Sequence, residues 1–402
     1  MPRNVPDNMR FEMQQEIYLD NSATTRQYDE VTELMADVAA KTFGNPSSLH
    51  TKGIEAEKLV KAAREAIAVS LGAEPKEIYF TSGGTESNNL AIRGYLDANP
   101  RKGKHIITTQ IEHPSVLEVY RHLEECGYKV DYISVDEAGR LNLQELRDKL
   151  DQETALISVI LVNNETGTIQ QMEEIAAIRD SINPQAVIHA DAVQTYGKIN
   201  IIPAKSGIGL LSMSSHKIHG PKGAGALYVS KKVRLKPLFF GGGQETLLRS
   251  GTENVPGIAG FGLASRLTFD RLESNHEKAD ILKSTFIDKL AKSDISYRVI
   301  SPAGASPYIL NIAFEDVRAE VLLHHLEQKG IYVSTGSACS SHKNTRSHVL
   351  SAMGVPAQLI DGAIRFSFSA FNTPEEISMT VDAIKEIIPV IEIHRKQKMR
   401  RQ

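Results

Sequence analysis

Cysteine is scarce in this sequence of 402 residues, which contains only Cys126 and Cys339. Two cysteines exclude a disulfide framework, and their spacing supports no cysteine-based metal site, so we predict no bound metal. Few cysteines without disulfides are typical of a reducing compartment, and we therefore expect a cytoplasmic protein. Cys126 is predicted to be an inert core residue near the end of a helix that begins after Pro114.

Strong net charge and long apolar runs are also missing. The formal net charge at pH 7 is -3, which gives no general attraction to nucleic acid or to an anionic membrane. No apolar run is long enough to span a bilayer, and the first residues lack the apolar core of a signal peptide. We expect no direct contact with nucleic acid or membrane. The basic end of the chain, residues 394–402, is predicted to be a solvated tail.

The chain is long enough for two domains, and its pattern changes along its length. From about Asp29, helical periodicity alternates with short apolar runs, which is typical of a mainly parallel sheet covered by helices on both faces. These runs are residues 77–82, 104–110, 130–135, 155–162, 186–193 and 208–214. We assign residues 29–262 to a large α/β domain and residues 263–402 to a smaller α+β domain, with strands at 296–301, 308–314 and 331–336. Residues 1–28 are expected to pack with the small domain or with the cleft beside it.

A lysine and an aspartate follow two of the apolar runs. In open α/β sheets the ligand site lies beyond the carboxyl ends of the strands, so residues that follow strands are candidates for chemistry. Lys217 follows the run 208–214 and is flanked by His216 and His219. A lysine held partly out of water becomes a nucleophilic amine, so Lys217 is a candidate for Schiff-base chemistry, with a structural role as the alternative. Asp191 ends an apolar segment, and a buried carboxylate requires a cationic partner.

Small and polar residues follow three other runs. Gly84 and Thr85 lead into a helix whose first turn can offer backbone N–H groups and a hydroxyl to an anion. This turn is neither GxGxxG nor a P-loop, so it supports neither dinucleotide nor ATP binding. His113 follows the run 104–110, where a lone histidine is more often structural than catalytic. Asn164 follows the run 155–162, where a turn is the ordinary explanation for an asparagine.

A lysine, an acidic residue and an anion-binding turn match the needs of pyridoxal 5′-phosphate. This cofactor requires a lysine for its aldehyde, an acid opposite its ring nitrogen and donors around its phosphate. Lys217, Asp191 and the Gly84–Thr85 turn supply these three groups.

The chain also resembles the NifS/IscS-type cysteine desulfurases, which belong to the class V aminotransferases. The resemblance runs from about Ile17 to about Pro389 and is carried by the motifs YLDNSATT, FGNPSSLH, FTSGGTESNNLAI, EHPSV, VNNETG, HADAVQTYGK, SSHKIHGPKG, GGGQETLLRSGT and STGSACSS. It implies a fold-type-I pyridoxal-phosphate-dependent transferase: a homodimer whose large domain has a mainly parallel seven-stranded sheet.

The resemblance also implies roles for individual residues. Lys217 would hold the cofactor and move protons, and Asp191 would keep the ring nitrogen protonated. Gln194 would donate to the phenolic oxygen. His113 would stack on the ring and take the proton of the substrate thiol. The phosphate would lie on Gly84, Thr85, Ser214 and His216, with Thr252 contributed by the other subunit.

Substrate and sulfur positions follow from the same resemblance. Arg365 would grip the α-carboxylate of L-cysteine with help from Asn164, because a guanidinium binds a carboxylate in a bidentate manner. Cys339 lies among small and polar residues beside His342 and Lys343, where a thiol is partly ionised and nucleophilic. It would take the substrate sulfur as a persulfide, release L-alanine and pass the sulfur to an acceptor protein for iron–sulfur cluster assembly or tRNA thiolation.

Two other functions fit parts of the sequence. An aminotransferase would use Lys217, Asp191 and Arg365 equally well, but it has no need for Cys339. A sulfur-relay scaffold without catalysis would not need the set of Lys217, Asp191, His113 and Cys339. The residues that follow Cys339 are more basic than expected for housekeeping iron–sulfur members, so the sequence leaves the identity of the acceptor open.

Overall fold

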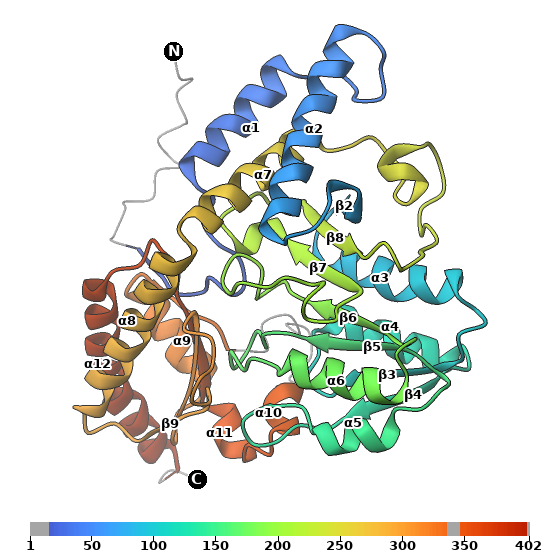
Figure 1. Ribbon diagram of the computed structural model, residues 1–402. Helices are drawn as coiled ribbons and strands as arrows, with labels where there is room; N and C mark the ends of the chain where they lie inside the picture. The colour runs from blue at the N-terminus through green and yellow to red at the C-terminus, as the bar shows by residue number, and fades with distance from the viewer. Residues whose placement is uncertain (1–15, 336–345, 400–402) are drawn as a thin grey trace.

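A seven-stranded sheet forms the centre of the computed structural model, which describes residues 16–335 and 346–399 (Figure 1). The strand order is β2-β8-β7-β6-β5-β3-β4. The pairs that join β7, β6, β5, β3 and β4 are parallel, whereas β8 runs antiparallel to both of its neighbours. The strands are Ile78–Thr81 (β2), His105–Thr109 (β3), Lys129–Ile133 (β4), Thr154–Ile160 (β5), Val187–Asp191 (β6), Leu210–Ser214 (β7) and Gly225–Val229 (β8). The predicted mainly parallel α/β fold is confirmed.

Helices cover both faces of this sheet. One buried cluster joins the sheet to α1 (Asp29–Lys41), α2 (Thr51–Ser70), α5 (Leu143–Lys149), α6 (Met172–Ile182) and α7 (Val255–Asp270). Another cluster joins the opposite face to α3 (Gly84–Ala98) and α4 (Pro114–Glu125). Consecutive residues alternate between the clusters, as Ile106 and Ile107 do in β3. This alternation explains why the strands read as continuous apolar runs.

Strand β8 was not among the six runs identified from periodicity. Its five residues, Gly225–Val229, follow a glycine-rich loop that masks the short apolar run. Strand β12 (Ala363–Ser367), which carries Arg365, was also missed. The buried Arg365 interrupts the apolar run of β12, so this strand does not stand out in the sequence as the other buried strands do.

A smaller antiparallel sheet, with strand order β12-β10-β9, forms a second core. Strands β9 (Tyr297–Val299) and β10 (Ile309–Phe314) coincide with predicted runs. Helices α8 (Leu272–Ala291), α9 (Ala319–Gln328) and α12 (Pro374–Met399) pack on this sheet at the lower left of Figure 1. The short helices α10 (His348–Ala352) and α11 (Ala357–Asp361) precede β12.

The start of the described chain pairs with the second core. Strand β1 (Ile17–Tyr18) lies parallel to β11 (Ile331–Tyr332), and Asp20 bridges to Ser367 of β12. The segment that follows, residues 20–25, then runs to the end of β7, where the backbone N–H of Thr25 donates to the carbonyl of His216 at 2.9 Å. The N-terminal segment therefore joins the two cores.

The predicted division after residue 262 falls inside α7. Phe261 and Ala264, on either side of this point, belong to the same buried cluster as α1 and α2. Helix α8 instead packs its Leu282 and Phe286 into the second core. A division at Arg271, between α7 and α8, keeps each helix with the core that it contacts. Among the helices of the described residues, none has the length and apolar content needed to cross a membrane.

Gly262 controls the approach of α7 to α2. A Cβ at this position would lie 2.6 Å from both Cα and Cβ of Ala63. Alanine normally stabilises a helix by about 1 kcal/mol relative to glycine. We expect Gly262→Ala instead to lower the free energy of unfolding by about 1–3 kcal/mol, because the helices must separate. Urea unfolding measures this change, and Arg266→Ala, on the exposed side of α7, is the matched control. A stabilised Gly262→Ala would contradict the close packing.

Candidate functional site

The predicted site residues gather beyond one edge of the large sheet. Strands β3, β5, β6 and β7 are parallel, and β2 shares their direction because β8 is antiparallel to both β2 and β7. The carboxyl ends of these five strands therefore meet at one edge. Asp191 and Ser214 end β6 and β7 there, and His113, Asn164 and Gly84 follow β3, β5 and β2. Lys217 ends the short helical turn Ser215–Lys217 that continues from β7.

The Lys217 amine is held by the segment from residue 20 to residue 25. Its Nζ donates to the carbonyl oxygens of Ser22 at 2.5 Å and Ala23 at 2.7 Å. The side-chain Nε2 of Gln194 donates to the same Ser22 oxygen at 2.8 Å. Two donors therefore converge on one oxygen, which places the lysine and the glutamine within reach of neighbouring groups on one ligand.

Asp191 is buried without a cation. It is 3% exposed, and its Oδ1 and Oδ2 accept hydrogen bonds from the backbone N–H of Val193 at 3.0 Å and from Nδ2 of Asn88 at 2.8 Å. Both donors are neutral, and no ion pair joins Asp191 to another described residue. No side chain of the described residues is therefore the cationic partner that was predicted for Asp191. The protonated ring nitrogen of pyridoxal 5′-phosphate would be a suitable partner.

Asn88 and Ser115 connect Asp191 to His113, a link that the sequence did not reveal. The Asn88 Nδ2 also donates to Ser115 Oγ at 2.8 Å, and Ser115 Oγ lies 2.8 Å from His113 Nδ1. The backbone N–H of Ser115 donates to the same Nδ1 at 3.1 Å and caps α4. Asn88 is 103 residues from Asp191 in sequence, so no local pattern marks the contact.

These contacts decide the protonation of His113. Burial lowers the pKa of His113, the charges of Lys217 and His348 lower it further, and the charge of Asp191 opposes them. The ring is therefore neutral near pH 7. Because a backbone N–H can only donate, Nδ1 is the acceptor and the ring proton lies on Nε2. In this form Nε2 already carries the ring proton. The predicted uptake of a thiol proton at Nε2 therefore requires the tautomer that is protonated at Nδ1.

The phosphate residues of the prediction surround the start of α3. Ser214 Oγ is buried and has no hydrogen-bond partner among the described residues. A Cβ on Gly84 would lie 2.6 Å from Val193 Cγ2, so a larger residue there would have to displace the Val193 side chain. Burial, together with Lys217 and Lys222, lowers the pKa of His216 to about 4, which keeps its ring neutral. Thr85 is exposed in the first turn of α3, where helix N–H groups favour an anion. An unsatisfied hydroxyl beside a helix N-terminus fits the phosphate of pyridoxal 5′-phosphate.

Arg365 lies on β12 at the facing edge of the second core. Its Nη2 donates to Oδ1 of Asp20 at 2.7 Å, and its Nη1 donates to the backbone oxygen of Asn164 at 3.0 Å. Its Nε is buried and has no partner among the described residues. Asp20 was missed in the sequence, although it belongs to the YLDNSATT motif. Asp20 fixes the plane of the guanidinium, and the open N–H remains for a ligand.

Thr252 and Cys126 stand apart from this group, and a further predicted position cannot be placed. Cys339, with His342 and Lys343, lies outside the described residues. Thr252 is exposed, and no hydrogen bond links it to Lys217 or Ser214 within the described chain. Cys126 was predicted to be a core residue but is exposed, because it caps the C-terminus of α4 one turn beyond the buried Leu123.

Two buried glutamates border the site and were also missed. Burial raises the pKa of Glu112 to about 8, although its Oε1 accepts hydrogen bonds from Thr109 Oγ1 at 2.6 Å and from the Ile160 N–H at 2.8 Å. Burial raises the pKa of Glu165 to about 7, against the effects of Ser347 and Arg365. The Ser347 hydroxyl donates to Glu165 at 2.6 Å.

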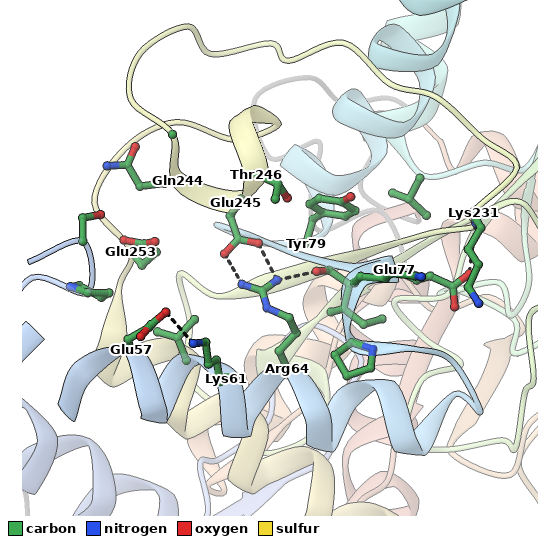
Figure 2. A pocket seen from close by; sticks show the side chains of 18 of the residues that line it. Glu57, Lys61, Arg64, Glu77, Tyr79, Lys231, Gln244, Glu245, Thr246 and Glu253 are labelled. Atoms are coloured by element: carbon green, nitrogen blue, oxygen red, sulfur yellow. Dashed lines mark hydrogen bonds and ion pairs between the residues drawn. The ribbon is translucent and has the colours of Figure 1, made fainter. Parts of the chain in front are cut away.

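A cavity of about 780 Å³ lies elsewhere, between α2 and the loop of residues 241–254 (Figure 2). Figure 2 shows Arg64 of α2 pointing to Glu245 of this loop. Arg64 Nη2 lies 2.6 Å from Glu245 Oε1, and Glu245 also accepts from the Phe80 N–H at 2.8 Å. The lining contains neither Lys217 nor Asp191, so this cavity is separate from the predicted site. Within the described residues, no cluster of three or more histidine, cysteine or acidic side chains could hold a metal ion.

Comparison with known proteins gives consistent matches over nearly the whole chain. The family described as aminotransferase class-V matches residues 17–379. A cysteine desulfurase IscS of Methanosarcina thermophila is 44% identical over 372 residues, which are 92% of each chain. A solved NifS-like protein is 40% identical with a TM-score of 0.88, over 94% of this chain and 100% of the other. A solved complex of SspA with cysteine is 34% identical with a TM-score of 0.79, over 89% of this chain and 100% of the other.

The raised pKa of Glu112 predicts a pH dependence of stability. Its value rises from 4.5 to about 8 on burial, so between these pH values the folded protein keeps a proton that the unfolded chain loses. The contribution of Glu112 to the free energy of unfolding therefore falls as the pH rises through this range. Glu112→Gln mimics the neutral acid and does not titrate. We expect its free energy of unfolding minus that of the unmodified protein to be about 1–3 kcal/mol larger at pH 8.5 than at pH 5.5.

Urea unfolding at the two pH values measures the difference. Glu124→Gln, at an exposed position of α4, is the control and should show no such change. An equal difference at both pH values would show that Glu112 is ionised in the folded protein.

Proposed function

The chain belongs to the aminotransferase class-V family and is a pyridoxal-phosphate-dependent cysteine desulfurase, and from this premise we propose how its residues divide the reaction. One observation carries the proposal: Lys217 and Gln194 converge on one oxygen, and Asp191, three residues before Gln194, is a buried carboxylate whose donors within the described chain are neutral.

The cofactor would lie at the carboxyl edge of the large sheet. When bound, pyridoxal 5′-phosphate supplies an aldehyde that condenses with amines and a protonated ring that draws electrons from the substrate carbon. Lys217 would hold the aldehyde carbon through Nζ, and Asp191 would keep the ring nitrogen protonated. Gln194 would donate to the phenolic oxygen from Nε2. The open hydroxyl of Ser214 would bind the phosphate with Gly84, Thr85 and His216.

His113 would pack against the ring face. Its Nδ1 is occupied by the Ser115 N–H, so we assign His113 the stacking role, and its uptake of the thiol proton would need a change of tautomer. The link through Ser115 and Asn88 would hold His113 and Asp191 at a fixed separation. A fixed separation matters because both residues would touch the same ring.

L-cysteine would bind between the two cores. Its α-carboxylate would take the open Nε–H of Arg365 and share the guanidinium with Asp20, and Asn164 would assist. Arginine suits this role because its planar donors match a carboxylate. Lys217 Nζ would give up its bond to the cofactor when the substrate amine binds and would form it again afterwards. This Nζ is half-buried and is held by two carbonyl groups.

Cys339 would take the sulfur. Its thiolate would attack the substrate sulfur, so that an S–S bond forms while the C–S bond breaks, and the carbon that keeps the electron pair takes a proton to give L-alanine. The persulfide would then pass to an acceptor protein for iron–sulfur cluster assembly or tRNA thiolation. A thiol in this role needs a reducing compartment, which supports a cytoplasmic location.

A homodimer would complete the site through the loop of residues 241–254. Exposed apolar side chains gather along this loop and along the connection between α1 and α2: Leu49 is 96% exposed, Phe240 87% and Leu247 67%. Both segments line the cavity of Figure 2. Such exposed apolar side chains mark an interface, and Thr252 in the same loop is free to reach a second copy.

Replacement of Cys339 separates cofactor binding from sulfur transfer. Cys339→Ser should bind pyridoxal 5′-phosphate and L-cysteine with unchanged affinity, yet make alanine at least about 100-fold more slowly, because a hydroxyl is a weak nucleophile toward sulfur. Alanine formation without a keto acid and alkylation of the persulfide provide the readouts. Cys126→Ser, the exposed second cysteine, is the matched control and should keep full activity.

Retained turnover in Cys339→Ser would remove this thiol from the reaction. A requirement for a keto acid in repeated turnovers of the unmodified protein would favour transamination instead.

The interface proposal predicts the effect of charge on the exposed apolar residues. The double variant Leu49→Asp and Phe240→Asp should sediment as a monomer, because unpaired carboxylates cannot be buried in an interface. It should also bind the cofactor more weakly, because Thr252 of a second copy is lost. Ile281→Asp, at an exposed position of α8, should remain a dimer. A dimeric double variant would place the interface elsewhere.

A further inference from the structure

Lys198 is buried directly behind the predicted cofactor residue Gln194. It is 6% exposed, and its Nζ donates to Gln194 Oε1 at 2.9 Å. The ammonium also lies 5.7 Å from the centre of the Tyr308 ring. Lys198 follows β6 by seven residues and was not a candidate in the sequence, where it reads as one of many lysines.

No acidic side chain compensates this lysine within the described part of the chain. The charged groups that act on it are Lys217 and Arg365, and both are positive. Burial lowers the pKa of Lys198 to about 7, and the two positive groups contribute to the same effect. A cavity of about 20 Å³ lined by Lys198, Lys217 and Tyr308 has room for one water and no larger anion. A buried amine in such surroundings costs stability, so its position calls for a functional reason.

The contact with Lys198 decides which way the Gln194 amide faces. Lys198 Nζ is the donor in this contact, so the oxygen of the amide faces Lys198 and the nitrogen faces away. The nitrogen then points to the Ser22 oxygen at 2.8 Å, which Lys217 Nζ also contacts at 2.5 Å. Reversal of the amide would bring two oxygens together at Ser22 and two donors together at Lys198. One buried lysine therefore makes Gln194 a donor on the side of Lys217.

We propose that Lys198 is a positioning residue that orients the Gln194 amide, so that Nε2 is always presented as a donor to the phenolic oxygen of the cofactor. This inference rests on the proposed function, because it assumes that the cofactor lies against Lys217 and Gln194. A fixed donor would stabilise the negative charge on the phenolic oxygen. The Lys217 nitrogen next to this oxygen would then lose its proton at lower pH, because the oxygen attracts that proton less strongly.

The experiment compares Lys198→Met with the unmodified full-length protein. Apoprotein is titrated with pyridoxal 5′-phosphate to give the Kd, and the visible absorbance of the bound cofactor is followed from pH 6 to pH 10. We expect Lys198→Met to raise the Kd about five- to tenfold, the loss of one oriented hydrogen bond. We also expect the pH midpoint of the absorbance to rise by about one unit, because an oriented donor and a nearby positive charge are both lost.

Three further variants separate positioning from a general structural effect. Lys205→Met, at an exposed position of the same segment, should leave both quantities unchanged. Lys198→Arg, which keeps a positively charged donor, should raise the Kd less than Lys198→Met does. In a Gln194→Ala background, Lys198→Met should add less than twofold to the Kd, because the residue through which it acts is absent.

The outcomes distinguish this inference from the proposed function. If the unmodified protein binds no pyridoxal 5′-phosphate, the proposed function is wrong. If it binds the cofactor but Lys198→Met has the same Kd and the same pH midpoint, only the inference about Lys198 is overturned. An equally large effect of Lys198→Met with and without Gln194 would also overturn it. Melting temperatures of all variants identify any that fold poorly. If Lys198→Met is among them, Lys198→Gln replaces it in the same two measurements, because its amide oxygen can face Gln194 and so removes the fixed orientation.

Discussion

The backbone of residues 20–25 is the constraint on which the site depends. On one side this segment is fixed to β12. The backbone N–H of Ser22 donates to Ser367 Oγ at 2.8 Å, and the side-chain Nδ2 of Asn21 donates to the Ser367 carbonyl at 2.8 Å. On the other side Thr25 is fixed to the carbonyl of His216. Its own carbonyl groups then hold the Lys217 amine, and its Asp20 holds Arg365. One short segment therefore sets the distance between Lys217 and Arg365.

The site is built from buried polar groups that are only partly satisfied. Within the described residues, Asp191 has no cation, Ser214 Oγ and Arg365 Nε have no hydrogen-bond partner, and Lys198 has no acid. Each such group costs free energy in the folded protein unless a ligand satisfies it. Their grouping around Lys217 distinguishes them from scattered packing faults. The same groups should therefore make the protein more stable when cofactor and substrate are bound.

The sequence predicted the parts of the fold and the site that depend on local pattern. Lys217 and Asp191 were predicted as site residues because Lys217 follows an apolar strand and Asp191 ends one, and the direction of parallel strands brings such residues to one edge. Strand β8 was missed because it follows a glycine-rich loop, and β12 was missed because the buried Arg365 interrupts its apolar run. The position of Cys126 was wrong because a residue at the end of a helix can turn outward even when its neighbours are buried.

Contacts between distant segments could not be read from the sequence. Asn88 acquires its role only because α3 packs against the end of β6, and Lys198 acquires its role only because Gln194 lies between it and the site. Asp20 pairs with a residue 345 positions away. The motifs that carry the resemblance contain these residues but do not show which side chain touches which.

The pairing of the first described strand with the last strands has a consequence for synthesis of the protein. Asn21 and Ser367 are 346 residues apart, so the contact between them cannot form until nearly the whole chain has left the ribosome. Until then the large sheet can fold, but the Lys217 amine lacks the carbonyl groups of Ser22 and Ala23 in their final place. A nascent chain therefore carries an incomplete site, and a chain truncated before β12 would not hold this lysine in position.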